Sequence, residues 1–166
     1  MRRTVLLAAA MLCLTACGLR PLYGGGPGSP VVQALRSVQV TPIPGQSGWL
    51  MRNKLIARLG EAGSASARYR LDVALDDNLK SFGLRSDRAA TQERRSLRAR
   101  YQLVDLSNGT VVLDATSGSD AGIDVVGSEY ATVAAEQTVL EQLSDRVADQ
   151  IVARLALYAN RTRPAQ

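Results

Sequence analysis

The residues of this chain best suited to chemistry are its two cysteines, Cys13 and Cys17. Cys13 lies within an unbroken apolar run over residues 5–14, and two arginines precede that run. A basic start, a short apolar segment and a small residue before the cut are typical of a secretory signal peptide. The run is too short for a membrane-spanning helix, which needs about 20 residues. We therefore predict that residues 1–16 are removed on export, which discards Cys13 and leaves Cys17 first.

The residues around Cys17 indicate an unusual cut. An ordinary signal peptidase site has small residues at both −3 and −1, but Leu14 stands at −3. Residues 14–17 (LTAC) instead resemble the lipobox of bacterial lipoproteins, in which the cysteine thiol carries a diacylglyceryl group through a thioether. Cys17 is the predicted lipidation site, and residues 17–30 form a lipidated N-terminus with a flexible tether. By the same resemblance, Gly18 at the next position favours the outer membrane.

The absence of histidine excludes several enzyme classes. Without histidine the chain lacks Ser-His-Asp hydrolysis, imidazole general-base catalysis and most zinc sites. Lipidation of Cys17 leaves no thiol for catalysis, a disulfide or a thiolate metal site. The glycines at residues 24–26 follow no strand and precede two prolines, so they fit a tether better than a phosphate-binding loop. We expect no enzyme, no cofactor and no metal.

The excess of basic residues favours an anionic ligand. The chain has 20 Lys and Arg against 15 Asp and Glu, and removal of Arg2 and Arg3 leaves 18 against 15. Export and an aromatic content of 4% argue against nucleic acid. The anions outside the cytoplasm are lipid phosphates and acidic sugars, and the planar fork of arginine matches phosphate in a bidentate manner. A genome that prefers arginine codons explains the same excess equally well.

Six arginines concentrate this charge within residues 85–100. They are Arg85, Arg88, Arg94, Arg95, Arg98 and Arg100. Such a cluster suits charge-assisted hydrogen bonds to phosphate groups, and it is the candidate ligand-binding site of the chain. The alternative, of equal weight, is a solvated hairpin whose charges only keep an edge strand soluble.

The strands that position these arginines follow from hydrophobic periodicity. Alternation of apolar and polar residues predicts strands over residues 35–41, 68–76, 94–103 and 110–116. The polar residues around Gly83 predict a loop, and Asn108-Gly109 predicts a hairpin turn.

Two segments have helical spacing. The first helix covers residues 49–59, with Ser47 as its cap and Gly60 at its end, and the second covers residues 129–158 with Ser128 as its cap. The second helix has one apolar stripe, formed by Val133, Leu140, Leu143, Val147, Ile151, Leu155 and Tyr158.

The resulting order is β-α-β-β-β-α, an α+β fold in one domain over residues 31–160 with a C-terminal tail over 161–166. Strands that are apolar on one face only imply a sheet covered by helices on one side. We therefore expect two helices to pack on one face of a four-stranded sheet. The other face is expected to be open and to carry Arg68, Arg70, Arg98 and Arg100.

Several motifs resemble the LptE family of lipopolysaccharide-assembly lipoproteins, in its alphaproteobacterial form. The most specific is the predicted mature start, CGLRPLYG at residues 17–24. Weaker matches to the family's helices and to one strand follow: LMRNKL at 50–55, RYRL at 68–71, EYA at 129–131, Glu136 and IVARLA at 151–156. Together these motifs span nearly all of the predicted mature chain.

This resemblance implies two helices on a four-stranded sheet and no catalysis. It implies a protein on the periplasmic face of the outer membrane that plugs an LptD-type translocon barrel and helps it assemble. It also implies binding of lipopolysaccharide on its way to the outer leaflet. An auxiliary lipoprotein of another envelope lipid-transport complex and a purely structural envelope scaffold are the alternatives.

Replacement of Cys17 tests the anchor. Cys17→Ser removes the thiol that a thioether requires, so we expect an uncleaved or unanchored form without lipid. Metabolic labelling with a palmitate analogue measures the attachment, and label retained by the variant would contradict the assignment. Cys13→Ser, in the segment predicted to be discarded, is the matched control and should keep the label.

Overall fold

The computed structural model describes residues 29–60, 62, 67–84, 90–124 and 128–162 of the 166-residue chain. The predicted signal peptide, Cys17 and the tether as far as residue 28 lie outside these described residues, as do Arg85, Arg88 and residues 163–166. The described elements are α2 (Pro30–Arg36), β1 (Val38–Val40), α3 (Gly45–Leu59), β2 (Tyr69–Leu84), β3 (Ala90–Asp105), β4 (Thr110–Asp124) and α4 (Glu129–Arg161).

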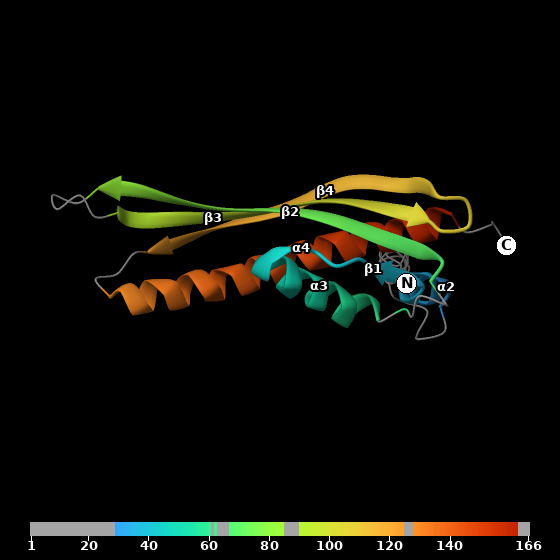
Figure 1. Ribbon diagram of the computed structural model, residues 1–166, viewed down its shortest axis with the longest axis horizontal. Helices are drawn as coiled ribbons and strands as arrows, with labels where there is room; N and C mark the ends of the chain where they lie inside the picture. Colours follow the sequence, from blue (N-terminus) through green and yellow to red (C-terminus); the bar gives the residue numbers. More distant parts are fainter. Residues whose placement is uncertain (1–28, 61, 63–66, 85–89, 125–127, 163–166) are drawn as a thin grey trace, which may run out of the picture.

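The strands form one sheet in the order β1-β2-β3-β4, and the helices lie beneath one of its faces (Figure 1). β1 is parallel to β2, whereas β2, β3 and β4 are antiparallel neighbours. The predicted hairpin turn joins β3 to β4, with Gly109 N donating to Asp105 O at 2.8 Å. This arrangement confirms the α+β fold with α3 and α4 on one face of a four-stranded sheet, and it adds the short helix α2.

The sheet is long, and its two halves are covered differently. β2 and β3 have 16 residues each and β4 has 15, which corresponds to about 50 Å of extended chain. α4 runs along the whole sheet, whereas β1, α2 and α3 lie against only the half that contains the β3–β4 turn (Figure 1). We call that half proximal, and we call the half where β2 and β4 end and α4 begins distal.

Two strands are longer than the sequence predicts. β2 continues through Gly83, where a loop was predicted, and β4 continues past Thr116 to Asp124. Towards α4 this part of β4 directs the small side chains of Ser117, Ser119 and Ala121, followed by the buried Ile123 at its end. Small side chains let the helix lie close to the sheet, but they provide no apolar alternation from which a strand could be predicted.

The prediction of a strand over residues 35–41 was wrong at its start, because Leu35 and Arg36 belong to the helix α2. The Ser29 hydroxyl accepts from Val32 N at 3.3 Å and so caps α2 instead. Pro30 occupies the first turn of this helix, where its missing N–H leaves no bond unmade. Only Val38–Val40 remains as a strand, and it pairs with the start of β2.

α3 begins at Gly45, directly after Pro44, so the predicted cap Ser47 lies inside the helix and was wrong. The helix ends at Gly60 as expected, with a φ of 87°. Close to its start, Gly48 packs against the preceding chain, because a Cβ there would lie 2.6 Å from the carbonyl oxygen of Ile43.

The hydrophobic core fills the proximal half, between the sheet and the two long helices. Its largest fully buried side chains are Met51, Leu55 and Leu59 of α3, Leu143, Val147, Ile151 and Leu155 of α4, and Leu71, Leu97, Tyr101 and Leu103 of the sheet. The predicted stripe of α4 is therefore confirmed, except at Val133. That side chain is 56% exposed, because the first turns of α4 extend into the distal half, beyond α3.

Charged side chains fix α3 against α4 at the edge of this core. Lys54 Nζ lies 2.9 Å from Asp145 Oδ2, and Arg58 donates to both Asp145 and Asp149 at 2.9 and 2.6 Å. The hydrogen bond from Lys54 is the main reason that the pKa of Asp145 lies below its ordinary value. These contacts set the register of one helix on the other.

Replacement of Ile151 tests the buried face of α4. Ile151→Asp places an unpaired carboxylate at a fully buried position, so the free energy of unfolding should fall by more than about 4 kcal/mol. Urea unfolding followed by circular dichroism measures the change. Arg154→Asp, on the exposed side of the same helix, should stay within about 0.5 kcal/mol of the wild type. Equal stability of the two variants would contradict the assigned face.

Candidate functional site

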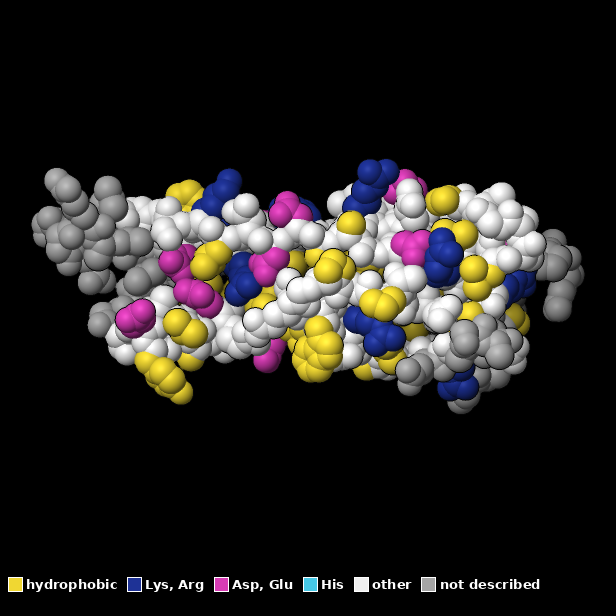
Figure 2. All heavy atoms as spheres, in the orientation of Figure 1, with side chains coloured by type: hydrophobic (Ala, Val, Ile, Leu, Met, Phe, Trp, Pro, Cys, Tyr) yellow, Lys and Arg dark blue, Asp and Glu magenta, His cyan; other side chains and the backbone are white. Residues whose placement is uncertain are grey.

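The candidate arginines lie mainly on the face of the sheet that no described helix covers, here called the open face. Along β3 the buried residues Leu97, Ala99 and Tyr101 point to the helices, so their neighbours point the other way. Those neighbours are Arg94, Ser96, Arg98, Arg100 and Gln102. Figure 2 shows basic and acidic side chains interspersed along the upper rim, where the sheet lies. The charge of the open face is therefore mixed.

Two of the candidate arginines are neutralised by β4. Arg98 Nη2 donates to Asp120 Oδ2 at 2.8 Å, and Arg100 Nη2 donates to Asp114 Oδ2 at 3.0 Å. The hydrogen bond from its arginine is the main reason that the pKa of each carboxyl group lies below its ordinary value. Both pairs are exposed, so each adds little to stability, but each arginine already has an anion beside it.

A glycine makes room for the first of these pairs. Arg98 reaches Asp120 by crossing over Gly118, its register partner on β4. A Cβ at Gly118 would overlap the Cδ of Arg98. The absence of a side chain at this position is thus part of the geometry of the pair.

The two arginines near the start of β2 are also engaged. Arg70, which was predicted on the open face, pairs there with Asp72 at 3.0 Å. Arg68 precedes the strand, and its guanidinium lies 5.2 Å from the ring centre of Tyr69.

Arg95 lies on the opposite face from the rest of the cluster. Its Nε and Nη2 donate to the two oxygens of Asp77 at 2.8 and 2.7 Å, and its Nη1 donates to the carbonyl of Glu136 in α4 at 3.0 Å. The side chains of Arg95 and Asp77 are only 16% and 18% exposed. The hydrogen bond to Asp77 is the main reason that the pKa of Arg95 is raised. This arginine ties the sheet to the helix.

Arg94 and Lys80 are two exposed cations without counter-ions in the described part of the chain. They lie opposite each other on β3 and β2, and Gly122 lies on the other side of Arg94. Neither side chain forms an ion pair or hydrogen bond with another described residue. Arg94 contributes to the lowered pKa of Asp120, but less than the hydrogen bond from Arg98 does. The distal half of the open face therefore carries two cations that have no ion-pair partner among the described residues, with the exposed carboxylates of Asp76 and Asp124 in the same hollows.

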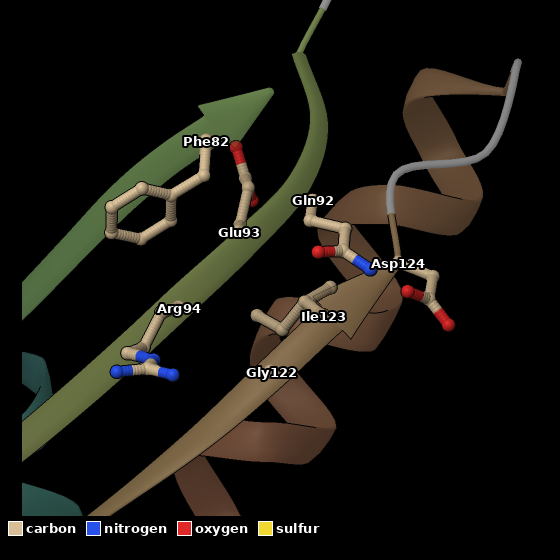
Figure 3. A pocket seen from close by; sticks show the side chains of 7 residues that line it. All are labelled: Phe82, Gln92, Glu93, Arg94, Gly122, Ile123 and Asp124. Atoms are coloured by element: carbon tan, nitrogen blue, oxygen red, sulfur yellow. The ribbon is translucent and has the colours of Figure 1, made fainter. Parts of the chain in front are cut away.

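This cationic pair adjoins an exposed aromatic ring and two shallow hollows. Phe82 of β2 is 48% exposed and lines both hollows together with Arg94. One hollow has a volume of about 300 Å³ and opens where β2 and β4 end and β3 begins (Figure 3). The other, about 440 Å³, lies along the open face and includes Lys80 and Asp76. A phosphate group and an apolar chain could be held here side by side.

Sequence reasoning missed two members of this site. Lys80 and Phe82 stand just before Gly83, in a stretch that was predicted as a loop rather than a strand. The signal that could have found them is the register, because a hairpin that places Leu71 opposite Leu103 also places Lys80 opposite Arg94. Arg85 and Arg88, in the connection between β2 and β3, lie outside the described residues.

Two other kinds of site are absent from the described residues. No group of three or more acidic or cysteine side chains there is arranged to hold a metal ion. None of the described helices combines the length and the apolar character needed to cross a bilayer.

Comparisons with known proteins agree with this fold. The model of the LptE family, described as lipopolysaccharide-assembly, matches residues 35–155. A predicted lipoprotein from Caulobacter crescentus CB15 has a similar solved structure with 27% identity and a TM-score of 0.66, over 82% of this chain and 100% of that one. Comparison with curated proteins gives no match.

Two more distant structures share the fold alone. A minor lipoprotein from Acinetobacter baumannii is 16% identical with a TM-score of 0.53, over 75% of this chain and 93% of that one. A lipoprotein B from Nitrosomonas europaea is 12% identical with a TM-score of 0.56, over 74% of this chain and 83% of that one.

Two adjacent aspartates test the distinction between the faces. Asp77→Asn leaves the half-buried Arg95 without its charged partner, so the free energy of unfolding should fall by about 2 kcal/mol. Asp76→Asn, one residue away on the open face, removes no ion pair among the described residues and should change stability by less than about 0.5 kcal/mol. Urea unfolding measures both variants, and an equal effect would show that Arg95 does not depend on Asp77.

Proposed function

Because the chain belongs to the LptE family of lipopolysaccharide-assembly lipoproteins, we propose that it plugs an outer-membrane β-barrel translocon of the LptD type and binds lipopolysaccharide there. The family is non-enzymatic, so the role is one of binding and assembly in the cell envelope. The lipid anchor at Cys17 and the resulting position on the periplasmic face of the outer membrane are part of the proposal.

The observation that carries the binding role is the cationic pair of Lys80 and Arg94 beside Phe82. Lipopolysaccharide has phosphate groups attached to a sugar backbone that bears acyl chains. Two exposed cations on adjacent strands can reach phosphate oxygens of one head group, and Phe82 offers apolar surface to an acyl chain. A ligand with both chemistries matches this part of the molecule better than a purely ionic one.

The remaining arginines differ in what they can contribute. Arg98 lines the same hollow as the pair, but it must share or exchange Asp120 to bind a phosphate. Arg100 lies further towards the proximal half and is held by Asp114. Arg85 and Arg88 stay in the proposed site because they connect the two strands that carry Lys80 and Arg94. Arg95 is proposed as a structural residue.

The shape of the described part suits a plug. Three long strands and α4 give an elongated two-layer body (Figure 1). The open face has acids beside its proximal arginines, as a surface placed against other protein requires if charges are not to be buried unpaired. The pairing of these arginines with aspartates also favours the second candidate function, an envelope scaffold that contacts protein and no lipid.

Neutralisation of the distal pair tests lipid binding against scaffolding. Lys80→Ser with Arg94→Ser should weaken binding of purified lipopolysaccharide by about tenfold, the loss of about 1.4 kcal/mol, because two uncompensated charges are removed. The loss should shrink at high salt, which screens the attraction in the wild type.

Arg98→Ser with Arg100→Ser is the matched control in the lipopolysaccharide assay. It removes the same number of charges from the same face of the sheet, but from arginines that already have acidic partners, so its effect should be smaller. Isothermal titration at two salt concentrations compares the two double variants. Wild-type affinity in the Lys80/Arg94 variant would defeat the proposed site and favour the scaffold.

A further inference from the structure

The two outer edges of the sheet are not equivalent. β1 covers the edge of β2 only at Tyr69, Arg70 and Leu71. After Val40 the chain forms one more bond, from Thr41 N to Leu71 O at 3.1 Å, and then leaves the sheet through two prolines. From Val73 to Ser81, β2 therefore has β3 as its only strand neighbour in the described part of the chain.

The hydrogen bonds at the start of β2 show which backbone groups face this free edge. Tyr69 N donates to Ser37 O at 3.1 Å, and Leu71 O accepts from Thr41 N, so the odd-numbered residues direct their peptide groups away from β3. Because this orientation alternates along an antiparallel strand, the outward N–H and C=O groups further along belong to Val73, Leu75, Asp77, Leu79 and Ser81. These groups bond to no other described residue.

The opposite edge, on β4, is partly closed by α4. The Gln150 carboxamide accepts from Gly118 N at 3.2 Å and donates to Gly118 O at 3.4 Å. The Gln150 side chain thus takes the two backbone hydrogen bonds of Gly118 that a neighbouring strand would otherwise form. At this edge a further strand would have to displace Gln150, whereas no described side chain forms a hydrogen bond with the outward backbone groups of residues 73–81 in β2.

We propose that the free edge of β2 over residues 73–81 binds an extended segment of the barrel partner by strand addition. This inference rests on the proposed function, which supplies the barrel. The strands of a closed barrel are already paired on both sides, so the segment must be a loop or a terminal segment of the barrel protein rather than one of its wall strands. Main-chain hydrogen bonds supply the affinity in this mode of recognition.

The side chains along the edge define what that segment must carry. Asp76 is exposed on the open face and has no ion-pair partner among the described residues, because its neighbour Arg98 turns to Asp120 instead. On the helix side, Leu75 is half-buried and Leu79 is exposed. A segment that alternates a basic residue opposite Asp76 with apolar residues beside Leu75 and Leu79 complements both faces.

A proline at an odd-numbered position blocks this edge and leaves the sheet paired. Leu79→Pro removes an N–H that points to the free edge and none that bonds to β3, and edge strands accept proline at such positions. Thr116→Pro is the matched control, since the alternation fixed by Gly118 directs the N–H of Thr116 to the other edge. The lipidated full-length variants are purified from detergent-solubilised outer membranes, and the barrel that accompanies them is quantified by mass spectrometry.

We expect Leu79→Pro to recover at least about tenfold less barrel than the wild type and Thr116→Pro to recover the wild-type amount. Equal recovery by all three proteins would overturn the edge proposal and leave the proposed function in place. If the wild type itself recovers no barrel, both the edge proposal and the proposed function are overturned.

A photo-crosslinking amino acid covers the case in which Leu79→Pro fails to fold. Placed at Asn78, which is exposed on β2, it should crosslink to the barrel protein in clearly higher yield than when it is placed at Thr116. Equal crosslinking to the barrel from both positions, or none from Asn78, would contradict strand addition at β2. Crosslinks from Asn78 to a second copy of this chain would replace the barrel segment with self-pairing and overturn the choice of partner.

Discussion

The packing of α4 along one face of the sheet is the interaction on which the rest of the structure depends. A three-stranded meander about 50 Å long cannot leave both faces in water. In the proximal half Leu143, Val147 and Ile151 of α4 share the core with α3. In the distal half α3 is absent, and the small residues of β4 let α4 approach while Arg95 bonds to the carbonyl of Glu136. One helix thereby covers one face of the sheet along its whole length, and the opposite face carries no described helix.

Where an element buries large apolar side chains, its sequence predicts it well. The alternation from Tyr69 to Leu75, the spacing of Met51, Leu55 and Leu59, and the stripe that ends α4 all correspond to buried faces. The prediction of an element from its sequence fails where the buried side chains are small or where the element is short. The distal part of β4 presents serine and alanine to the helix before its single large residue, Ile123. Val31 and Leu35 face the core from α2, a helix of seven residues that is too short to show periodicity.

The candidate site was predictable in its composition and not in its geometry. Six arginines within residues 85–100 predict a single cationic surface. Strand alternation moves Arg95 to the other face, and the register with β4 brings Asp120 and Asp114 to Arg98 and Arg100. Those aspartates lie at least fourteen residues away in sequence from their arginines, beyond any local pattern. Lys80 and Arg94, which have no ion-pair partner among the described residues, are brought together by a strand pairing that a predicted loop around Gly83 excludes.

The position of the chain's N-terminal part adds a constraint on how the molecule is held. Ser29 and α2 lie at the proximal end, where α2 packs beside the end of α4. Between the proposed lipid anchor at Cys17 and Ser29 the chain can span at most about 40 Å, which is less than the length of the long strands. A lipid anchor at Cys17, as proposed, would keep the proximal end within about 40 Å of the membrane surface, while Lys80, Arg94 and the free edge of β2 lie towards the opposite end of the body. Under the proposed function, an anionic lipid at the distal end and the acyl chains of the anchor would then use different ends of the same body and would not compete for one surface.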